Sequence, residues 1–193
     1  MSDHGQYIDI HTHHPRPDVA SPRMAGVHPW SAEAVVAIPL FEECDIVGET
    51  GLDYAVEVNR EAQERLFREH LSWAERTGKP VVLHCVKAFE PMMNILRNYK
   101  LQGVVFHSFI GNTQQAERCF ARGYHISFGA RSLRSPKSRE VLRQMPAEYL
   151  FCETDNDMVP AIEEVYRMVA EIRGTTPQEL LEQIEKNYKQ LFR

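Results

Sequence analysis

Residues 77–85, Thr-Gly-Lys-Pro-Val-Val-Leu-His-Cys, contain the end of a helix followed by a complete strand. Gly78 is typical of the residue that terminates a helix, and Pro80 cannot continue one. The apolar run after Pro80 shows no polar alternation, which favours a strand buried on both faces, as in a parallel sheet. This strand ends in His84, and residues 103–108, Gly-Val-Val-Phe-His-Ser, repeat the pattern. The two stretches predict neighbouring parallel strands that each end in a histidine.

Apolar runs and amphipathic helical stretches alternate along most of the chain. Strands are expected at residues 7–13, 24–28, 45–50, 80–84, 103–107, 124–128 and 149–153. Helices are expected at residues 31–41, 56–77, 88–98, 112–122, 138–144, 160–172 and 177–188. Strict alternation of strands and helices predicts a parallel sheet with helices outside it.

Polar or ionisable side chains stand at nearly every expected strand end, and this decides how the sheet closes. An open sheet gathers ligands mainly at its switch point, whereas every strand of a barrel contributes to one mouth. No glycine-rich phosphate loop follows the first strand, which further disfavours a nucleotide-binding open sheet. We therefore expect an α/β fold, a TIM-like parallel β/α barrel, as one domain over residues 1–193.

The composition is that of an ordinary globular protein, with 43% apolar and 25% charged residues among 193. A formal charge of −5 argues against long-range attraction of nucleic acid, although bound divalent cations would change the local charge. No apolar run is long enough to span a membrane, and the first residues show no secretory signal. The four cysteines form no Cys-x-x-Cys motif, which favours reduced thiols in a cytoplasmic protein.

The stretch Tyr-Ile-Asp-Ile-His-Thr-His-His at residues 7–14 places three ionisable side chains on one face of a strand. Asp9, His11 and His13 share parity, so they project to the same side. Burying such a face without partners would cost roughly 1–3 kcal/mol for each unsatisfied group. A metal ion bound by the two histidines would remove that cost.

Two further motifs add carboxylates to this set. Gly-Glu-Thr-Gly-Leu-Asp, residues 48–53, places Glu49 between small residues that leave space for a ligand, and Asp53 resembles a helix cap in a polar loop. Residues 149–155, Tyr-Leu-Phe-Cys-Glu-Thr-Asp, end a buried strand with Glu153 and Asp155. Imidazoles and carboxylates together suit zinc, manganese or nickel, which indicates a metal-dependent hydrolase.

The order of these motifs resembles the TatD family of metal-dependent hydrolases over nearly the whole chain. The resembling segments are DIHTHH, GVHPW, GETGLD, PVVLHC, VVFHSFIG, ISFGA and YLFCETD. The resemblance implies a TIM-like barrel with two divalent metal ions, zinc first and manganese, nickel or magnesium as alternatives. It also implies a phosphodiester substrate, with DNA trimmed from its 3′ end.

The resemblance also assigns roles to residues of this chain. His11 and His13 would bind one ion, His84 and His107 the other, and Glu49 both. Asp155 would complete the first site and deprotonate the attacking water, which makes Asp155 and Glu49 the catalytic residues. The assigned supporting residues are Asp9 and Glu153 behind the ligands, and His28 at the substrate. Lys87 is a further candidate for the substrate that the resemblance does not assign.

Two departures from the family are visible in the sequence. Only twelve residues, three of them prolines, separate His13 from Gly26, which is too few for the usual crossover to a second strand. Either the second strand is missing and a distorted barrel of seven strands remains, or distortion of the neighbouring strands closes the gap. Val86 stands where the family often has a phosphate-binding arginine. Arginines 16, 23, 131 and 134 are candidates to replace it, and Trp30 and Phe109 to stack on a base or sugar.

Two other functions remain open at this point. The same metal centre would serve an amidohydrolase or deacylase that polarises a carbonyl group, and the loss of the arginine at position 86 favours this slightly. A metal-binding relative without activity is the other alternative, and the presence of Glu49 and Asp155 argues against it. The sequence does not indicate an oligomer, although a partner could cover the exposed edge left by the missing strand.

Overall fold

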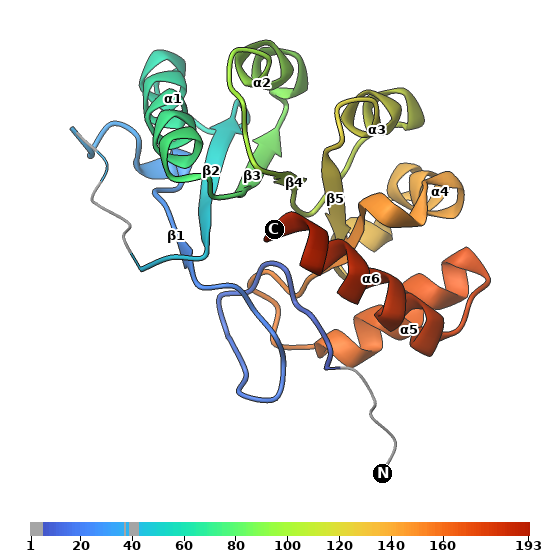
Figure 1. Cartoon of the computed structure of the whole chain (residues 1–193). Coiled ribbons are helices and arrows are strands. Elements are labelled where there is room, and N and C mark those ends of the chain that lie inside the picture. Colours follow the sequence, from blue (N-terminus) through green and yellow to red (C-terminus); the bar gives the residue numbers. More distant parts are fainter. Residues whose placement is uncertain (1–5, 37, 39–42) are drawn as a thin grey trace. The chain divides into compact units, whose positions relative to one another are not determined.

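The computed structural model describes residues 6–36, 38 and 43–193, which divide into two compact units. One unit comprises Arg23–Phe106 and Phe192. The other comprises the described residues before Arg23 together with His107–Leu191 and Arg193. Figure 1 traces the elements of both units along the chain.

The unit of residues 23–106 is a parallel sheet flanked by helices. Its strands β1, β2, β3 and β4 are hydrogen-bonded in chain order, and each pairing is parallel. Helices α1 and α2 pack against β2 and β3 (Figure 1). The bounds are β1 Met24–Ala25, η1 Pro29–Ser31, β2 Ile46–Asp53, α1 Arg60–Thr77, β3 Val81–Val86, α2 Phe89–Leu96 and β4 Val104–Phe106.

Helix α1 shows how local sequence fixes the elements of this unit. Asn59 caps its first turn by accepting a hydrogen bond from the Ala62 amide. Gly78 ends it in the left-handed conformation at φ 62°, as its place before Pro80 predicted. The face buried against β2 includes Leu66, Phe67 and Leu71, spaced as one side of a helix requires.

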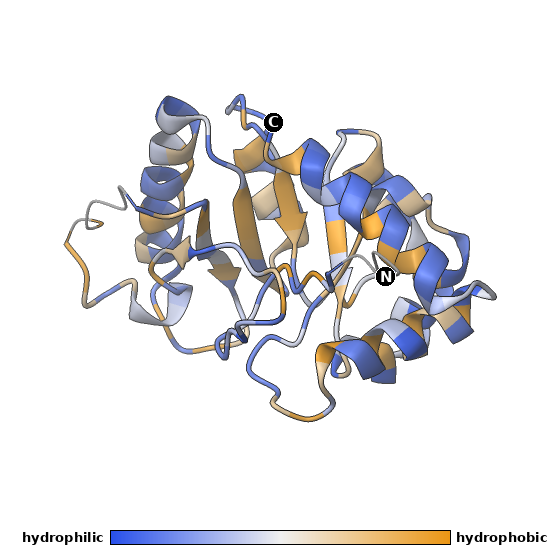
Figure 2. Ribbon diagram, turned by 60° about the horizontal axis from the view of Figure 1, so that its bottom comes forward, coloured by the Kyte–Doolittle hydropathy of each residue, from blue (hydrophilic) through white to orange (hydrophobic). Residues whose placement is uncertain are grey.

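The second unit contains two parallel strands and four α-helices. Strand β5 pairs with β6, α3 packs against β5, and α5 and α6 pack against β6. In Figure 2 the strands are largely hydrophobic, whereas the helices carry both hydrophobic and hydrophilic faces. The bounds are α3 Thr113–Phe120, β5 His125–Phe128, η2 Ser132–Arg134, α4 Pro136–Gln144, η3 Ala147–Tyr149, β6 Leu150–Cys152, α5 Ile162–Arg173 and α6 Pro177–Leu191.

The expected first strand is an extended segment beside β6 and not a regular strand. It forms two isolated parallel bridges, Ile8 with Ala20 and Thr12 with Asp155. The Ile10 amide also donates to the Cys152 carbonyl at 3.1 Å. Six strands are therefore defined among the described residues, one fewer than the seven predicted.

The other differences from the predicted elements are local. The strand expected at residues 24–28 is only two residues long, and β2 runs on to Asp53 instead of ending at residue 50. In place of the helix expected at 31–41, the described part contains η1 and a turn, and residues 37 and 39–41 lie outside the described part. No helix among the described residues is both long and apolar enough to cross a membrane. The interpretation of the chain as one hydrolase domain stays a prediction.

Candidate metal centre

Strands β2 and β3 bring Glu49 and His84 together. The Glu49 Oε1 atom lies 2.7 Å from His84 Nδ1. Gly51 is the residue of β2 that pairs with His84, and a Cβ atom at Gly51 would lie 2.1 Å from the His84 carbonyl oxygen. Its φ of +147° is also reserved for glycine. The glycine therefore permits the close approach of the two strands that places the carboxylate beside the imidazole.

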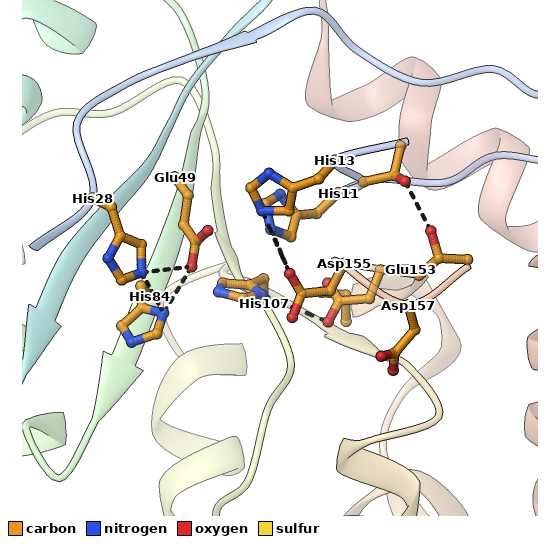
Figure 3. A network of polar contacts seen from close by, with 12 residues as sticks. His11, His13, His28, Glu49, His84, His107, Glu153, Asp155 and Asp157 are labelled. Carbon is orange, nitrogen blue, oxygen red and sulfur yellow. Dashed lines mark hydrogen bonds and ion pairs between the residues drawn. The ribbon is translucent and has the colours of Figure 1, made fainter. Parts of the chain in front are cut away.

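His28 joins this pair and is closer to the candidate ligands than its predicted substrate role implied. Its Nε2 atom lies 3.3 Å from His84 Nδ1 and 3.4 Å from Glu49 Oε1. The side chain is held in part by the Trp30 amide, which donates to His28 Nδ1 at 3.3 Å. One ligand atom from each of His28, Glu49 and His84 lies within 4.8 Å of the others (Figure 3). We call these three residues the first donor cluster.

Asp53 contacts His84 of the first donor cluster. The sequence prediction gave this residue no role in the metal site. Its Oδ2 atom lies 3.1 Å from His84 Nε2, and the residue is buried. Burial alone would raise the pKa of Asp53, but hydrogen bonds from Trp30, Ala55 and His84 outweigh this effect and hold that pKa below its usual range. The available signal was parity, because Glu49 and Asp53 are four residues apart in one strand and project to the same face.

His11, His13 and Asp155 form the second donor cluster, within the other unit. The Asp155 Oδ1 atom lies 3.4 Å from His11 Nε2 and 3.6 Å from His13 Nε2, and Figure 3 shows these side chains pointing toward one another. The backbone fixes this geometry, because the His13 amide donates to the Asp155 carbonyl and the Asp155 amide to that of His11. His11 is buried, whereas half of the His13 side chain is exposed.

His107 lies in the same unit as the second donor cluster. Its ring centroid is 4.4 Å from that of His11. Glu153, which is fully buried, places its Oε1 atom 3.7 Å from His107 Nδ1 and accepts a 2.5 Å hydrogen bond from Ser127 Oγ at Oε2. At 3.7 Å the two atoms are beyond hydrogen-bond distance, and the supporting role of Glu153 stays a prediction. The assignment of His84 and His107 to one ion is untested and stays a prediction.

Asp9 is a buried carboxyl group held by Thr154. The Thr154 amide and hydroxyl donate to its two oxygens at 3.1 and 2.6 Å. Burial raises the pKa of Asp9 to about 7, against the lowering effects of Thr154 and of the charge on His11. Asp9 thus anchors the start of the segment that carries His11 and His13.

The cationic side chains proposed as replacements for the missing arginine differ in how available they are. Lys87 follows the end of β3 and is exposed. Arg16 is bound by two carboxylates and Arg23 by one. Arg131 lies 3.9 Å from the carboxylates of both Asp155 and Asp157, which is longer than a hydrogen bond, and its side chain is 60% exposed. Through Asp155 it is placed beside the second donor cluster.

Histidines and carboxylates gathered at the carboxyl ends of parallel strands are typical of a metal-dependent hydrolase with an α/β fold. The family described as TatD related DNase matches residues 17–193. The chain belongs to the TatD family.

Individual relatives agree with this assignment. The chain is 31% identical over 198 residues to the 3'-5' ssDNA/RNA exonuclease TatD of Escherichia coli K12, covering 87% of this chain and 76% of the relative. It is 32% identical, over the same shares, to the protein of that name from Shigella flexneri. The crystal structure of a TatD homologue from Escherichia coli K12 matches with a TM-score of 0.74 at 22% identity, covering 97% of this chain and 98% of the other.

These comparisons confirm three of the predictions made from sequence: the TatD family, the TIM-like α/β fold class and the hydrolase class. The structural match also extends to a TatD family protein from Entamoeba histolytica, with a TM-score of 0.74 at 16% identity over 90% of this chain and 75% of the other. The family match begins after His11 and His13. The ligand role of these two histidines therefore depends on their geometry with Asp155.

Proposed function

We propose that this protein is a metal-dependent nuclease that removes nucleotides from the 3′ end of single-stranded DNA or RNA. The observation that carries the proposal is the pair of donor clusters, each offering imidazole nitrogens and a carboxylate oxygen within 4.8 Å. Nitrogen and oxygen donors in this combination fit divalent transition-metal ions. The substrate follows from the TatD relatives, which are named as exonucleases on these nucleic acids.

The proposal includes two bound divalent metal ions, and zinc is the metal that we expect. The second donor cluster would hold one ion, and Glu49 and His84 the other. Divalent ions at such residues lower the pKa of a bound water and stabilise charge on phosphoryl oxygens. The sharing of Glu49 between two ions and the participation of His107 beside His84 stay predictions.

Side chains of the protein accept the proton, bind the phosphate and position the candidate ligands. The carboxylate of Asp155, which is 18% exposed, accepts the proton of the water that attacks phosphorus. The guanidinium of Arg131 lies beside Asp155 and is available to bind a non-bridging phosphate oxygen. Asp9 holds the segment of His11 in place through its hydrogen bonds with Thr154, and Glu153 supplies a negative charge beside His107.

A cytoplasmic location belongs to the same proposal. It is supported by the absence of any disulfide among the four cysteines, all of which are in the described part of the chain. Detection of the protein in the cytosolic fraction of its cell would test the location.

The test of the activity combines metal analysis with cleavage of 3′-labelled single-stranded DNA and RNA. We expect about two metal ions per chain and stepwise shortening that EDTA abolishes. Asp155→Asn should keep most of the metal and lose turnover, whereas Asp18→Asn, at an exposed carboxylate bound to Arg16, should retain full activity. Bound metal without cleavage of either nucleic acid would contradict the proposal and favour an amide or small phosphodiester substrate.

A further inference from the structure

Trp30 presents a large exposed aromatic surface beside the first donor cluster. Its side chain is 59% exposed, whereas the other tryptophan, Trp73, is buried. The Trp30 ring meets the His28 ring edge to face, with centroids 4.6 Å apart, and its centroid lies 6.2 Å from that of His84. The Trp30 ring contributes little to the hydrophobic core, because most of it is exposed. Its position beside candidate metal ligands therefore points to a role in binding and not in packing.

Several contacts hold the indole in one orientation. Trp30 Nε1 donates to Asp53 Oδ2 at 2.8 Å, and its backbone amide donates to His28 Nδ1. The residue sits in the short helix η1, which begins at the buried Pro29. A ring that is already immobilised loses little conformational entropy when a ligand stacks on it.

We propose that Trp30 is a stacking platform for an unpaired nucleobase of the substrate. This inference rests on the proposed nuclease function and adds a binding residue to it. A nucleobase is the part of a nucleic acid that fits this surface, because it is flat and uncharged and is not repelled by Glu49 and Asp53. Every base has an aromatic face, so such a platform binds single strands with little sequence preference. A base inside a duplex is already stacked and paired, so the platform selects single-stranded ends.

One carboxylate oxygen connects this platform to the candidate metal site. Asp53 Oδ2 accepts from Trp30 Nε1 at 2.8 Å and lies 3.1 Å from His84 Nε2. The indole and the imidazole therefore share an anchor. A base stacked on Trp30 is held at a fixed distance from the residue that binds the metal, which positions the adjoining phosphodiester.

The first test is a binding measurement that needs no turnover. In Trp73→Phe the indole of Trp30 is the sole tryptophan, so its fluorescence reports directly on this surface. The metal-loaded protein is titrated with a phosphorothioate oligothymidylate and with an abasic oligomer of equal length. We expect quenching by the thymidylate and binding roughly 5- to 150-fold weaker for the abasic chain. Equal quenching by both, or quenching by neither, would overturn the proposal.

The second test separates the base contact from the chemistry. Trp30→Ala should raise KM for single-stranded DNA roughly 5- to 150-fold and leave KM for a chain with an abasic 3′ end unchanged. Trp30→Phe, which keeps a ring without the N–H group, should retain much of the preference for base-bearing ends. Val36→Ala removes another exposed apolar side chain of the same unit and serves as the matched control.

The outcomes distinguish this inference from the proposed function. An unchanged KM in Trp30→Ala, with DNA still cleaved, would refute stacking and leave the nuclease function intact. If the wild-type protein cleaves no nucleic acid, the nuclease function fails, and the fluorescence titration still decides whether Trp30 binds a base.

Discussion

Gln63 of α1 is the residue whose replacement tests how the Asp53 end of β2 is supported. Its Oε1 atom accepts from the Asp53 amide at 2.7 Å, and its Nε2 atom donates to the carbonyl oxygens of Asp53 and Val58 at 2.9 and 3.1 Å. The side chain is fully buried. Gln63→Met keeps the length of the side chain and removes all three hydrogen bonds.

The cost follows from the backbone groups that lose their partner. The amide and carbonyl of Asp53 are in a buried residue, and each unsatisfied group costs about 1–3 kcal/mol. The Val58 carbonyl is less enclosed and can bind water, and burial of the apolar methionine offsets about 1 kcal/mol. We expect the free energy of unfolding to fall by about 1–5 kcal/mol, which corresponds to a Tm lower by roughly 2–20 °C for a chain of this size.

Thermal unfolding followed by circular dichroism measures this change. Gln114→Met, at an exposed position of α3, makes the same substitution without loss of a buried partner, and should change stability by no more than about 0.5 kcal/mol. A Gln63→Met protein with the Tm of the wild type would refute the reasoning, since it would mean that water or another group replaces Gln63 at no cost.

Two further predictions concern the same unit. Gly51→Ala should greatly reduce metal retention and thermal stability together, because the new Cβ would meet the His84 carbonyl oxygen; wild-type metal content, measured by elemental analysis, would contradict this. His70 donates to the Leu66 carbonyl and accepts from the Val27 amide, and burial lowers its pKa. Its contribution to stability is therefore complete above about pH 6.5 and is lost as the pH falls through the lowered pKa. His70→Gln should lower Tm at pH 7.5 and lose less further stability than the wild type between pH 7 and pH 5; parallel Tm profiles would refute this.

Local periodicity predicted that His11 and His13 share a face, and the resemblance to the TatD family added Asp155 to them. His11 and His13 have the same parity, and they meet Asp155 although the segment is too irregular to count as a strand. Parity is preserved in any extended backbone, so the prediction did not depend on the hydrogen-bond ladder.

The first donor cluster was predicted less completely because it depends on register. The strand was expected to end at residue 50, which left Asp53 in a loop. The register of β2 against β3 shifts between Val47 and Thr50, and the alternation of side chains along the sequence does not specify where such an irregularity falls. The place of His28 is set by the short helix after it, where the sequence had favoured a longer helix.

The shortened stretch after His13 leaves the segment of the candidate ligands His11 and His13 supported. A missing strand would expose backbone amides and carbonyls of its neighbour, and such groups need partners when buried. Here the Asp9 amide donates to the Ala20 carbonyl at 2.9 Å, and the Ala20 amide donates to that of Tyr7 at 2.8 Å. The chain around Ala20 therefore supplies part of the hydrogen bonding that a neighbouring strand would give. It forms a parallel bridge with Ile8, which is buried. Since the segment that begins at Asp9 is held in this way, the short connection between His13 and Gly26 is compatible with the geometry of the second donor cluster.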